Sequence, residues 1–225
     1  RAPGYARADI AVSTADRAPT AVAVAVLRAL HHPDSGAWRE EARPLRRPDG
    51  TPSSTTSSVT VGKGAVPLAP VSGAALLWDR RLPEVHAANL LPVLGARAGG
   101  RLVRLERDGG EAAKTPESLI SAWRELLEAG VDRDTPLWVV GGGTLTDLGG
   151  LVAHGFKRGL PLSLLPTTLL AQLDAALGGK NGINLDRTKN AIGTVRLPET
   201  VHLDPLFLLT LEDVDLRGGL AEAVK

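Results

Sequence analysis

The strongest constraint on the fold is an alternation of short apolar runs and helical patterns in the second half of the chain. Leu137–Val140 and Leu162–Leu165 have the length and composition of strands buried on both faces. Between them, apolar residues recur at helical spacing at Leu145, Leu148, Val152 and Phe156. Strands and helices that alternate at this rhythm predict a parallel sheet with helices on its faces. The expected fold class is therefore α/β, with a Rossmann-like parallel sheet and flanking helices.

Further elements extend this pattern in both directions. Thr115 and Pro116 suit an N-cap followed by proline at the first helical position, and Gly130 ends that helix. Another helix is expected over Thr168–Leu177, after Pro166 has stopped the preceding strand. The remaining strands are expected at Val59–Val61, Ala74–Trp78 and Arg101–Leu105.

The first 58 residues give mixed signals. Ala18–His32 fits either an alanine-rich helix or, through AVAVAV, a strand. Arg46–Ser58 is rich in turn residues, serine and threonine, which is typical of a linker. We expect an N-terminal extension and linker over residues 1–58 and an α/β domain over residues 59–212. The chain begins at Arg1 and has no methionine, so we expect it to be trimmed at that end.

The composition argues against several classes of partner. The net charge is only +1 and no five like charges follow one another, so neither a nucleic acid nor a membrane surface is an expected partner. No apolar run reaches the 18 residues that would indicate a transmembrane helix. The absence of cysteine fits a cytoplasmic location.

Three consecutive glycines, Gly141–Gly143, stand between a predicted strand and a predicted helix. Residues without a Cβ let the backbone approach a phosphate, and a helix N-terminus offers free N–H groups and a partial positive charge. The turn therefore predicts a nucleotide site, although a tight strand-to-helix turn without a ligand has the same sequence. The spacing is not GxGxxG, so the usual dinucleotide fingerprint is absent.

Several polar residues near the predicted strand ends have a binding and a structural interpretation. Of Thr167 and Thr168, one can cap a helix while the other binds a ligand. The Glu111 carboxylate can hold ribose hydroxyls and Lys114 can reach a second polar group nearby, or both can be solvated loop charges. Basic side chains able to neutralise a phosphate or carboxylate are Arg158, Lys180 and Lys189. His202 and Asp204 are expected to be structural.

Read together, the ordered motifs resemble the 3-dehydroquinate synthase family of sugar-phosphate cyclases. The resemblance extends from Val59 to Lys225 and is densest after Gly110. Its motifs are GGGTLTDLGG, KRGLP, PTTLLAQLDAALGGK, N…KN, DPLFLLTL and GLAEAVK. The resemblance implies an NAD-binding α/β domain followed by a helical domain, with the active site between them. Residues 213–225 would then begin a truncated helical domain.

The resemblance also implies residue roles. The NAD-binding positions would be Glu111, Lys114, Gly142, Gly143, Thr144, Asp147, Thr167, Thr168, Lys189, Phe207, Leu208, Leu209 and Thr210. The substrate-binding positions would be Arg158, Asp174, Lys180, Asn190 and Lys225, of which Asp174, Lys180 and Lys225 would be catalytic. Glu222 matches the carboxylate ligand of a catalytic zinc or cobalt ion. The remaining metal ligands, two histidines, would follow Lys225, so the chain alone is expected to be inactive.

The implied reaction converts 3-deoxy-arabino-heptulosonate 7-phosphate to 3-dehydroquinate with loss of phosphate, in the shikimate pathway. NAD oxidises a substrate hydroxyl transiently, which acidifies the neighbouring C–H and allows phosphate to leave. Thr144 and Thr146 depart from the residues usual in dehydroquinate synthases, as does Asn181 after GGK. A TD pair, Thr146-Asp147 here, also occurs in the branch that resembles 2-epi-5-epi-valiolone synthases, whereas GGK matches dehydroquinate synthases better.

Three alternatives remain open from the sequence. The first is a cyclase of secondary metabolism that acts on another sugar phosphate. The second is a metal-dependent polyol dehydrogenase, which PTTLLAQLDAALGGK and KN disfavour. The third is a stand-alone NAD-binding or assembly module without catalysis. For the enzyme, the resemblance implies a homodimer at full length.

Overall fold

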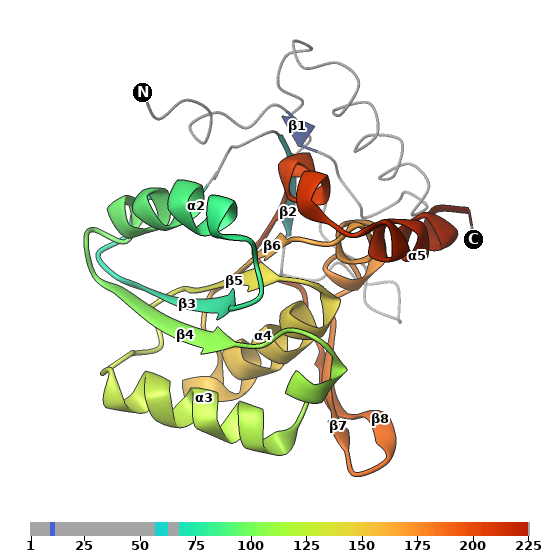
Figure 1. Cartoon of the computed structure of the whole chain (residues 1–225). Coiled ribbons are helices and arrows are strands. Elements are labelled where there is room, and N and C mark those ends of the chain that lie inside the picture. Colours follow the sequence, from blue (N-terminus) through green and yellow to red (C-terminus); the bar gives the residue numbers. More distant parts are fainter. Residues whose placement is uncertain (1–9, 12–56, 63–67, 225) are drawn as a thin grey trace, which may run out of the picture.

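The computed structural model describes residues 10–11, 57–62 and 68–224 (Figure 1). A seven-stranded sheet has the order β1-β2-β9-β6-β5-β3-β4, and all its neighbours are parallel except the short β1, which pairs antiparallel with β2. Its strands are β1 (Ile10–Ala11), β2 (Ser58–Val61), β3 (Ala74–Asp79), β4 (Leu102–Arg107), β5 (Leu137–Gly141), β6 (Leu162–Pro166) and β9 (Thr200–Leu203). The α/β class predicted from the sequence is confirmed.

Helices cover both faces of this sheet (Figure 1). On one face, α2 (Glu84–Arg97) and η4 (Pro205–Thr210) pack with Trp78, Trp138 and Val140. The other face carries α3 (Pro116–Glu128), α4 (Gly143–Gly155) and the π-helical turn η3 (Ala171–Ala175). The sheet is thus buried on both faces, which explains why β3, β5 and β6 are buried along their whole length. The remaining helical elements are η1 (Glu111–Ala113), η2 (Phe156–Arg158) and α5 (Asp213–Val224).

Helix α3 is bounded at both ends by the residues that the sequence predicted. The Thr115 hydroxyl accepts a hydrogen bond of 3.2 Å from the Ser118 N–H, and Pro116 opens the helix. Gly130 follows the helix with φ +67°, a conformation that favours glycine. These features fix where α3 begins and ends, and therefore how the chain returns from β4 to β5.

Three features differ from the sequence expectation. The helix expected over Thr168–Leu177 is mostly the π-helical turn η3. The long segment before β9 forms an antiparallel hairpin, β7 (Lys180–Leu185) and β8 (Thr188–Val195), which packs along α4. No element was expected at α2, whose weak amphipathic pattern is interrupted by Pro92. Ala18–His32 and nearly all of the predicted linker lie outside the described residues.

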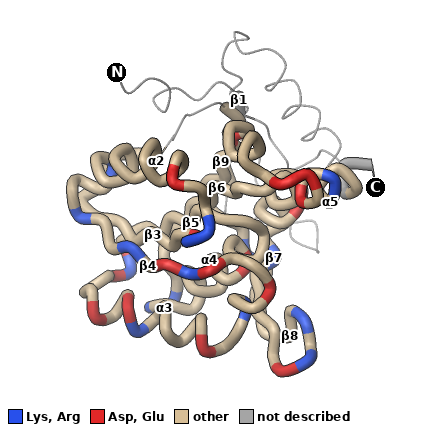
Figure 2. Tube along the Cα trace, viewed as in Figure 1, with Lys and Arg blue, Asp and Glu red and all other residues tan. Residues whose placement is uncertain are grey.

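Charged residues of both signs are interspersed along the described trace in Figure 2, and neither sign collects in one part of it. This distribution agrees with the net charge of +1. Among the described residues, no helix is long and apolar enough to cross a membrane.

Candidate cofactor site

The strand order reverses between β3 and β5. From β3 the chain moves outward to β4, and from β5 it moves the other way to β6. In open parallel sheets, ligands bind outside the carboxyl ends of the strands at such a reversal. The chain leaves β3 at Asp79 and β5 at Gly141, so these two loops form the edge at which a ligand is expected.

The glycine turn places the start of α4 at this edge. Gly142 is the N-cap, and its carbonyl accepts hydrogen bonds from the N–H groups of Leu145 and Thr146. The first N–H groups of a helix have no partner within the helix, so Gly143 and Thr144 present donors at this end of α4. The Thr144 hydroxyl accepts a 3.0 Å hydrogen bond from the Gly110 N–H, which joins the loop after β4 to the same turn. This is the arrangement that receives a pyrophosphate in nucleotide-binding folds.

The same glycines also have a packing role. A Cβ at Gly142 would lie 3.1 Å from the Thr168 Cγ2 atom, and one at Gly143 would lie 3.2 Å from the Ala175 Cβ atom. The absence of side chains therefore lets the Thr168–Ala175 segment lie against the start of α4. The tight-turn interpretation and the binding interpretation both apply to this turn.

The two threonines after β6 have different environments. Thr168 is the one that caps, because its hydroxyl accepts a 3.3 Å hydrogen bond from the Ala171 N–H. Thr167 is buried, and its N–H donates to the Gly141 carbonyl at 2.9 Å. That bond continues the β5–β6 pairing into the glycine turn and fixes the two loops relative to each other.

Next to the turn, Lys114 is a buried cation held by two acceptors. Its side chain is 4% exposed, and its Nζ atom lies 2.7 Å from the Asp147 Oδ2 atom and 2.6 Å from the Asn190 Oδ1 atom. Burial raises the pKa of the Asp147 carboxyl, the Lys114 contact opposes that shift, and the charges of Glu111 and Asp174 add to it. Lys114 thus links the start of α4 to the hairpin β7–β8.

Asn184 connects this group of residues further. Its Nδ2 atom donates to the Glu111 Oε1 atom at 2.9 Å, and its Oδ1 atom accepts the Asn190 N–H at 2.9 Å. Asn190 has φ +51°, a left-handed conformation that asparagine tolerates better than most residues. The structure therefore brings together Glu111, Lys114, Asp147 and Asn190. Asn184 was part of a sequence motif, but nothing in the sequence indicated that it joins them.

The Phe207–Thr210 segment lies in η4, which follows the carboxyl end of β9 on the sheet face that α2 covers. Phe207 is buried against the α2 face, while Leu209 is 73% exposed.

The buried Gln172 side chain donates to the carbonyls of Pro166 and Asp204, at 3.1 and 2.9 Å, and so joins the ends of β6 and β9. His202 and Asp204 are structural, as expected: His202 contacts the Thr60 hydroxyl across β9 and β2, and the Asp204 carboxylate caps η4 at the Leu206 N–H.

Other predicted site residues lie elsewhere. Lys180 is exposed and pairs with Val195 at the base of the hairpin, about 13 Å along β7 from Asn184. Lys189 is exposed on β8. Glu222 lies in α5, and Lys225 lies outside the described residues.

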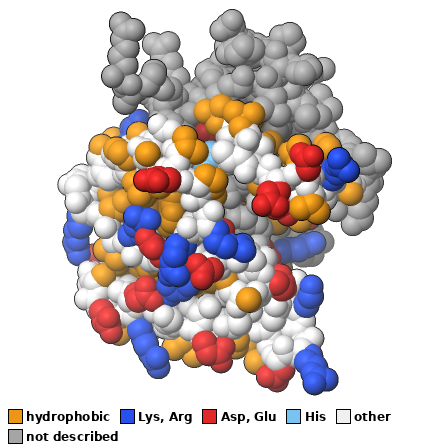
Figure 3. Space-filling model, in the orientation of Figure 1, with side chains coloured by type: hydrophobic (Ala, Val, Ile, Leu, Met, Phe, Trp, Pro, Cys, Tyr) orange, Lys and Arg blue, Asp and Glu red, His pale blue; other side chains and the backbone are white. Residues whose placement is uncertain are grey.

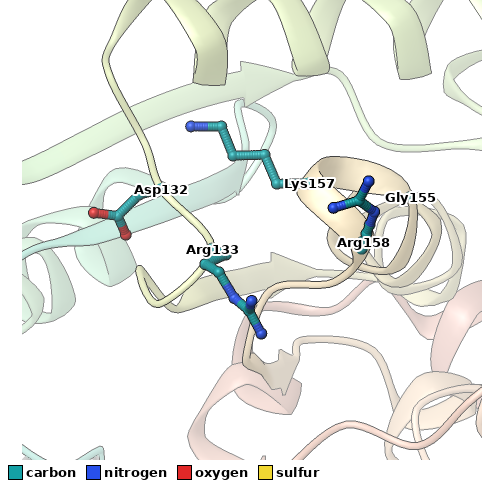
Figure 4. Close-up of a pocket in the computed structure, with 5 residues that line it drawn as sticks. All are labelled: Asp132, Arg133, Gly155, Lys157 and Arg158. Atoms are coloured by element: carbon teal, nitrogen blue, oxygen red, sulfur yellow. The ribbon is translucent and has the colours of Figure 1, made fainter.

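Arg158 lies at the opposite edge of the sheet from the glycine turn. It follows α4 with φ +71° and lines a hollow of about 640 Å³ with Asp132, Arg133, Gly155 and Lys157. Figure 4 shows Lys157 and Arg158 at the end of α4, facing the loop that carries Asp132 and Arg133 ahead of β5. The structure therefore does not bring Arg158 together with the glycine turn or with Lys114.

Asp79 was not singled out from the sequence. Its Oδ1 atom accepts the N–H groups of Arg81 and Gly109, each at 3.0 Å, so it joins the ends of β3 and β4. A Cβ at Gly109 would collide with the Asp79 carboxylate, which explains the glycine there. The sequence did place an acid directly after the predicted strand Ala74–Trp78, but it did not show that the strand order reverses there.

The parallel sheet, its reversal between β3 and β5, and the glycine turn together define a nucleotide-binding α/β domain. A sequence model described as 3-dehydroquinate synthase N-terminal matches residues 104–218. This is about half of the chain, and the chain belongs to the 3-dehydroquinate synthase family.

Curated relatives agree with this assignment. The 3-dehydroquinate synthase of Cutibacterium acnes is 40% identical over 74% of this chain and 45% of its own length. That of Chlorobium luteolum is 46% identical over 67% of this chain and 41% of its own length. The chain thus spans less than half the length of these relatives.

Solved structures share the fold. The 2-epi-5-epi-valiolone synthase of Streptomyces hygroscopicus subsp. jinggangensis, solved with NAD+ and Zn2+, superposes with a TM-score of 0.68 and 29% identity, over 76% of this chain and 49% of that chain. A 2-deoxy-scyllo-inosose synthase superposes with a TM-score of 0.67 at 24% identity, over 74% of this chain and 48% of that chain. At that identity, the second likeness shows the fold alone.

Proposed function

We propose that this chain is the NAD-binding part of a sugar-phosphate cyclase of the 3-dehydroquinate synthase type. The reaction is the conversion of 3-deoxy-arabino-heptulosonate 7-phosphate to 3-dehydroquinate with loss of phosphate. The observation that carries the proposal is the glycine turn at the reversal between β3 and β5, where Gly110, Thr144 and the first N–H groups of α4 meet. The relatives that are 40% to 46% identical support the choice of reaction.

The described residues fit an NAD molecule at this edge. Gly142, Gly143 and Thr144 would receive the pyrophosphate on backbone N–H groups. Glu111 is exposed beside them, and its carboxylate is free to accept hydrogen bonds from ribose hydroxyls in addition to the Asn184 amide. Thr167, Thr168 and the Phe207–Thr210 segment would border the cofactor on the β6 and β9 side. When bound, NAD accepts a hydride from a substrate hydroxyl and later returns it.

Substrate contacts form a second part of the proposal. Asp174, Lys180, Asn190 and Lys225 would hold the sugar phosphate, with the lysines opposite the phosphate that leaves. Lys180 is exposed at the hairpin base, so its ammonium group can reach a ligand. Arg158 is proposed as a substrate-binding residue only because of its place in the KRGLP motif. It lies at the opposite edge of the sheet from the glycine turn, which does not support its contact with a substrate bound at the glycine turn of the same chain.

A metal site is supported less directly. Among the described residues, no group of three or more histidine, cysteine, aspartate or glutamate side chains is placed to hold a metal ion. Three protein ligands are usual at a catalytic zinc. We therefore propose Glu222 as one zinc or cobalt ligand in a full-length protein, and we expect the 225-residue chain by itself not to turn over substrate.

A second candidate is a cyclase of the 2-epi-5-epi-valiolone synthase type, favoured by Thr146 before Asp147 and by the structural likeness at 29% identity. The structure weakens the sequence argument. The Thr146 hydroxyl donates to the Gly143 carbonyl at 2.9 Å, and Thr144 accepts from Gly110. Both threonines thus make hydrogen bonds within the turn itself, which gives each of these departures a local structural role.

The remaining organisation belongs to the same proposal. Residues 59–212 would form the NAD-binding domain, and α5 would begin a helical domain that closes over the cofactor. A homodimer and a cytoplasmic location are proposed for the full-length protein, on the family resemblance and the cysteine-free composition.

Phosphate release tests the reaction. The full-length protein, with NAD and zinc or cobalt, should release phosphate from 3-deoxy-arabino-heptulosonate 7-phosphate and much less from sedoheptulose 7-phosphate. The reverse preference would favour the second candidate. Release by the repurified 225-residue chain would contradict the proposed division of the active site.

A further inference from the structure

His86 is a buried polar residue that the cofactor site described so far does not use. It lies in the first turn of α2, directly after the loop that follows β3, and is 4% exposed. Among the described residues, its hydrogen bond and its aromatic contact both go to η4. The Nε2 atom lies 2.7 Å from the Thr210 Oγ1 atom, and the imidazole ring lies 4.8 Å from the Phe207 ring, centroid to centroid, at an angle of 48°.

The direction of the His86–Thr210 hydrogen bond follows from the other bond that Thr210 makes. The Thr210 hydroxyl donates its single proton to the Phe207 carbonyl at 3.1 Å. The His86 Nε2 atom must therefore be the donor, which assigns the proton of the neutral ring to Nε2. Burial lowers the pKa of His86, which favours this neutral form.

The contact joins two sides of the cofactor edge. In the sheet, β6 and β5 lie between β9, which leads into η4, and β3, which leads into α2. The Phe207 side chain packs into the core that covers these strands, with Val140 of β5 and Leu165 of β6. His86 thus holds η4 across the ends of the two strands that carry the glycine turn and the paired threonines.

The segment η4, which His86 contacts, is short and partly exposed. η4 is a six-residue 3-10 helix, a conformation with poorer hydrogen-bond geometry than an α-helix. Its Thr210 end is exposed, as is the neighbouring Leu209. Asp204 fixes the start of η4 at the Leu206 N–H, whereas the Thr210 side chain is fixed by His86 and by the Phe207 carbonyl.

We propose that His86 is a positioning residue for the cofactor, acting through Thr210. With its proton directed at the Phe207 carbonyl and one lone pair taken by the His86 Nε2–H, the Thr210 hydroxyl offers the cofactor an acceptor and no donor. It therefore receives a hydrogen bond from a donor group of the dinucleotide, of the class of a ribose hydroxyl or a carboxamide N–H. The inference rests on the proposed binding of NAD at this edge.

The test is a double-mutant cycle on NAD affinity, measured by calorimetry with the 225-residue chain. His86→Phe keeps the ring contact with Phe207 and removes the donor, and Thr210→Val removes the acceptor. Each is expected to weaken NAD binding roughly fivefold, the usual effect of one lost hydrogen bond. The double variant is expected to bind no more weakly than either single variant, because both changes remove one shared interaction.

Two further variants separate positioning from general stability. His86→Gln offers an amide N–H and is expected to retain affinity within about twofold of the wild type. Asn89→Ala removes the exposed hydrogen bond to the Val85 carbonyl in α2 and should not change NAD affinity. Thermal unfolding of all variants is measured beside the titrations, and the effect on affinity should not follow the effect on stability.

Several results would overturn the inference. Wild-type affinity in His86→Phe would remove His86 from the cofactor site, and losses that multiply in the double variant would show that the two residues act separately. Failure of His86→Gln to restore affinity would assign His86 a packing role only. If the wild-type chain itself gives no NAD binding, the proposed cofactor site fails, and this inference fails with it.

Discussion

Lys114 is a buried cation whose charge must be compensated by neighbouring side chains. A lysine that is 4% exposed loses nearly all its hydration, and its two partners, Asp147 and Asn190, must replace that water. The Asp147 side chain remains 21% exposed, so its carboxylate keeps part of its contact with water. Removing one partner of a buried pair costs more than removing both, because the remaining charge is left without compensation.

A prediction follows for Asp147. Asp147→Leu should lower the free energy of unfolding by about 3 kcal/mol, because Lys114 then stays buried with a single acceptor. The double variant Lys114→Met with Asp147→Leu should recover most of that loss. Urea unfolding at neutral pH measures both changes. Equal losses in the single and the double variant would show that the ion pair is not what holds this region.

Residue roles were predictable from the sequence where the signal is local. Thr115 was expected as an N-cap and is one, because capping depends on the two or three residues that follow. Asp79 and His86 were missed, because their partners lie 30 and 124 positions away in the sequence. The composition of a loop cannot indicate which distant backbone group a carboxylate or an imidazole will meet.

Among the elements, the hairpin β7–β8 depends on a close fit to α4. A Cβ at Gly150 would collide with the Asn181 side chain, whose Nδ2 atom donates to the carbonyls of Gly179 and Arg196 at 2.9 and 3.0 Å. His154 lies at the same contact, with its Nδ1 atom 3.1 Å from the Thr194 Oγ1 atom. Asn181, one of the departures from the family pattern, thus closes the base of the hairpin.

This contact should make stability depend on pH. Burial and the nearby Arg196 lower the pKa of His154 from 6.5 to about 4. Below pH 6.5 the unfolded chain therefore binds a proton that the folded chain resists, and stability is lost as the pH falls toward 4. His154→Gln should lose less unfolding free energy than the wild type between about pH 7 and pH 5. Because His86 and His202 titrate in both proteins, their effects cancel in this comparison, and equal losses would contradict the assignment.

The predictability of elements followed their periodicity. Strands β3, β5 and β6 and helices α3 and α4 were expected near their observed bounds, since burial on both sheet faces leaves continuous apolar runs. The hairpin was missed because every residue of β8 is exposed, so its sequence lacks the alternation of apolar and polar residues that indicates a half-buried strand. The helix expected at Thr168–Leu177 has the right apolar spacing, but its five central residues form a π-helical turn.

At the scale of the whole molecule, apolar side chains are exposed around η4 and α5. Leu209, Val214 and Leu220 are 73%, 70% and 40% exposed, and Figure 3 shows hydrophobic side chains among charged ones over this part of the surface. Surfaces of this kind promote association when nothing covers them.

We therefore expect the 225-residue chain to self-associate as its concentration rises. Leu209→Ser combined with Val214→Ser should reduce the association, which sedimentation velocity can measure. Leu127→Ser is the matched control, because Leu127 is 63% exposed on α3, on the other side of the sheet. An equal effect of the control would show that association is not directed by the η4–α5 surface.

The central claim is that NAD binds at the glycine turn between β5 and α4, and calorimetric titration of NAD tests it most directly. Gly142 has φ −72° and ψ −179°, a backbone conformation open to any residue, so Gly142→Val acts through its side chain, which meets Thr168 and the space above the turn. Gly178→Val is the control, because a Cβ there meets no atom within 4 Å. The account predicts that Gly142→Val weakens NAD binding by at least about tenfold with unchanged circular dichroism, and that Gly178→Val binds as the wild type does. Equal NAD affinity in the wild type and Gly142→Val would place the cofactor elsewhere and contradict the account.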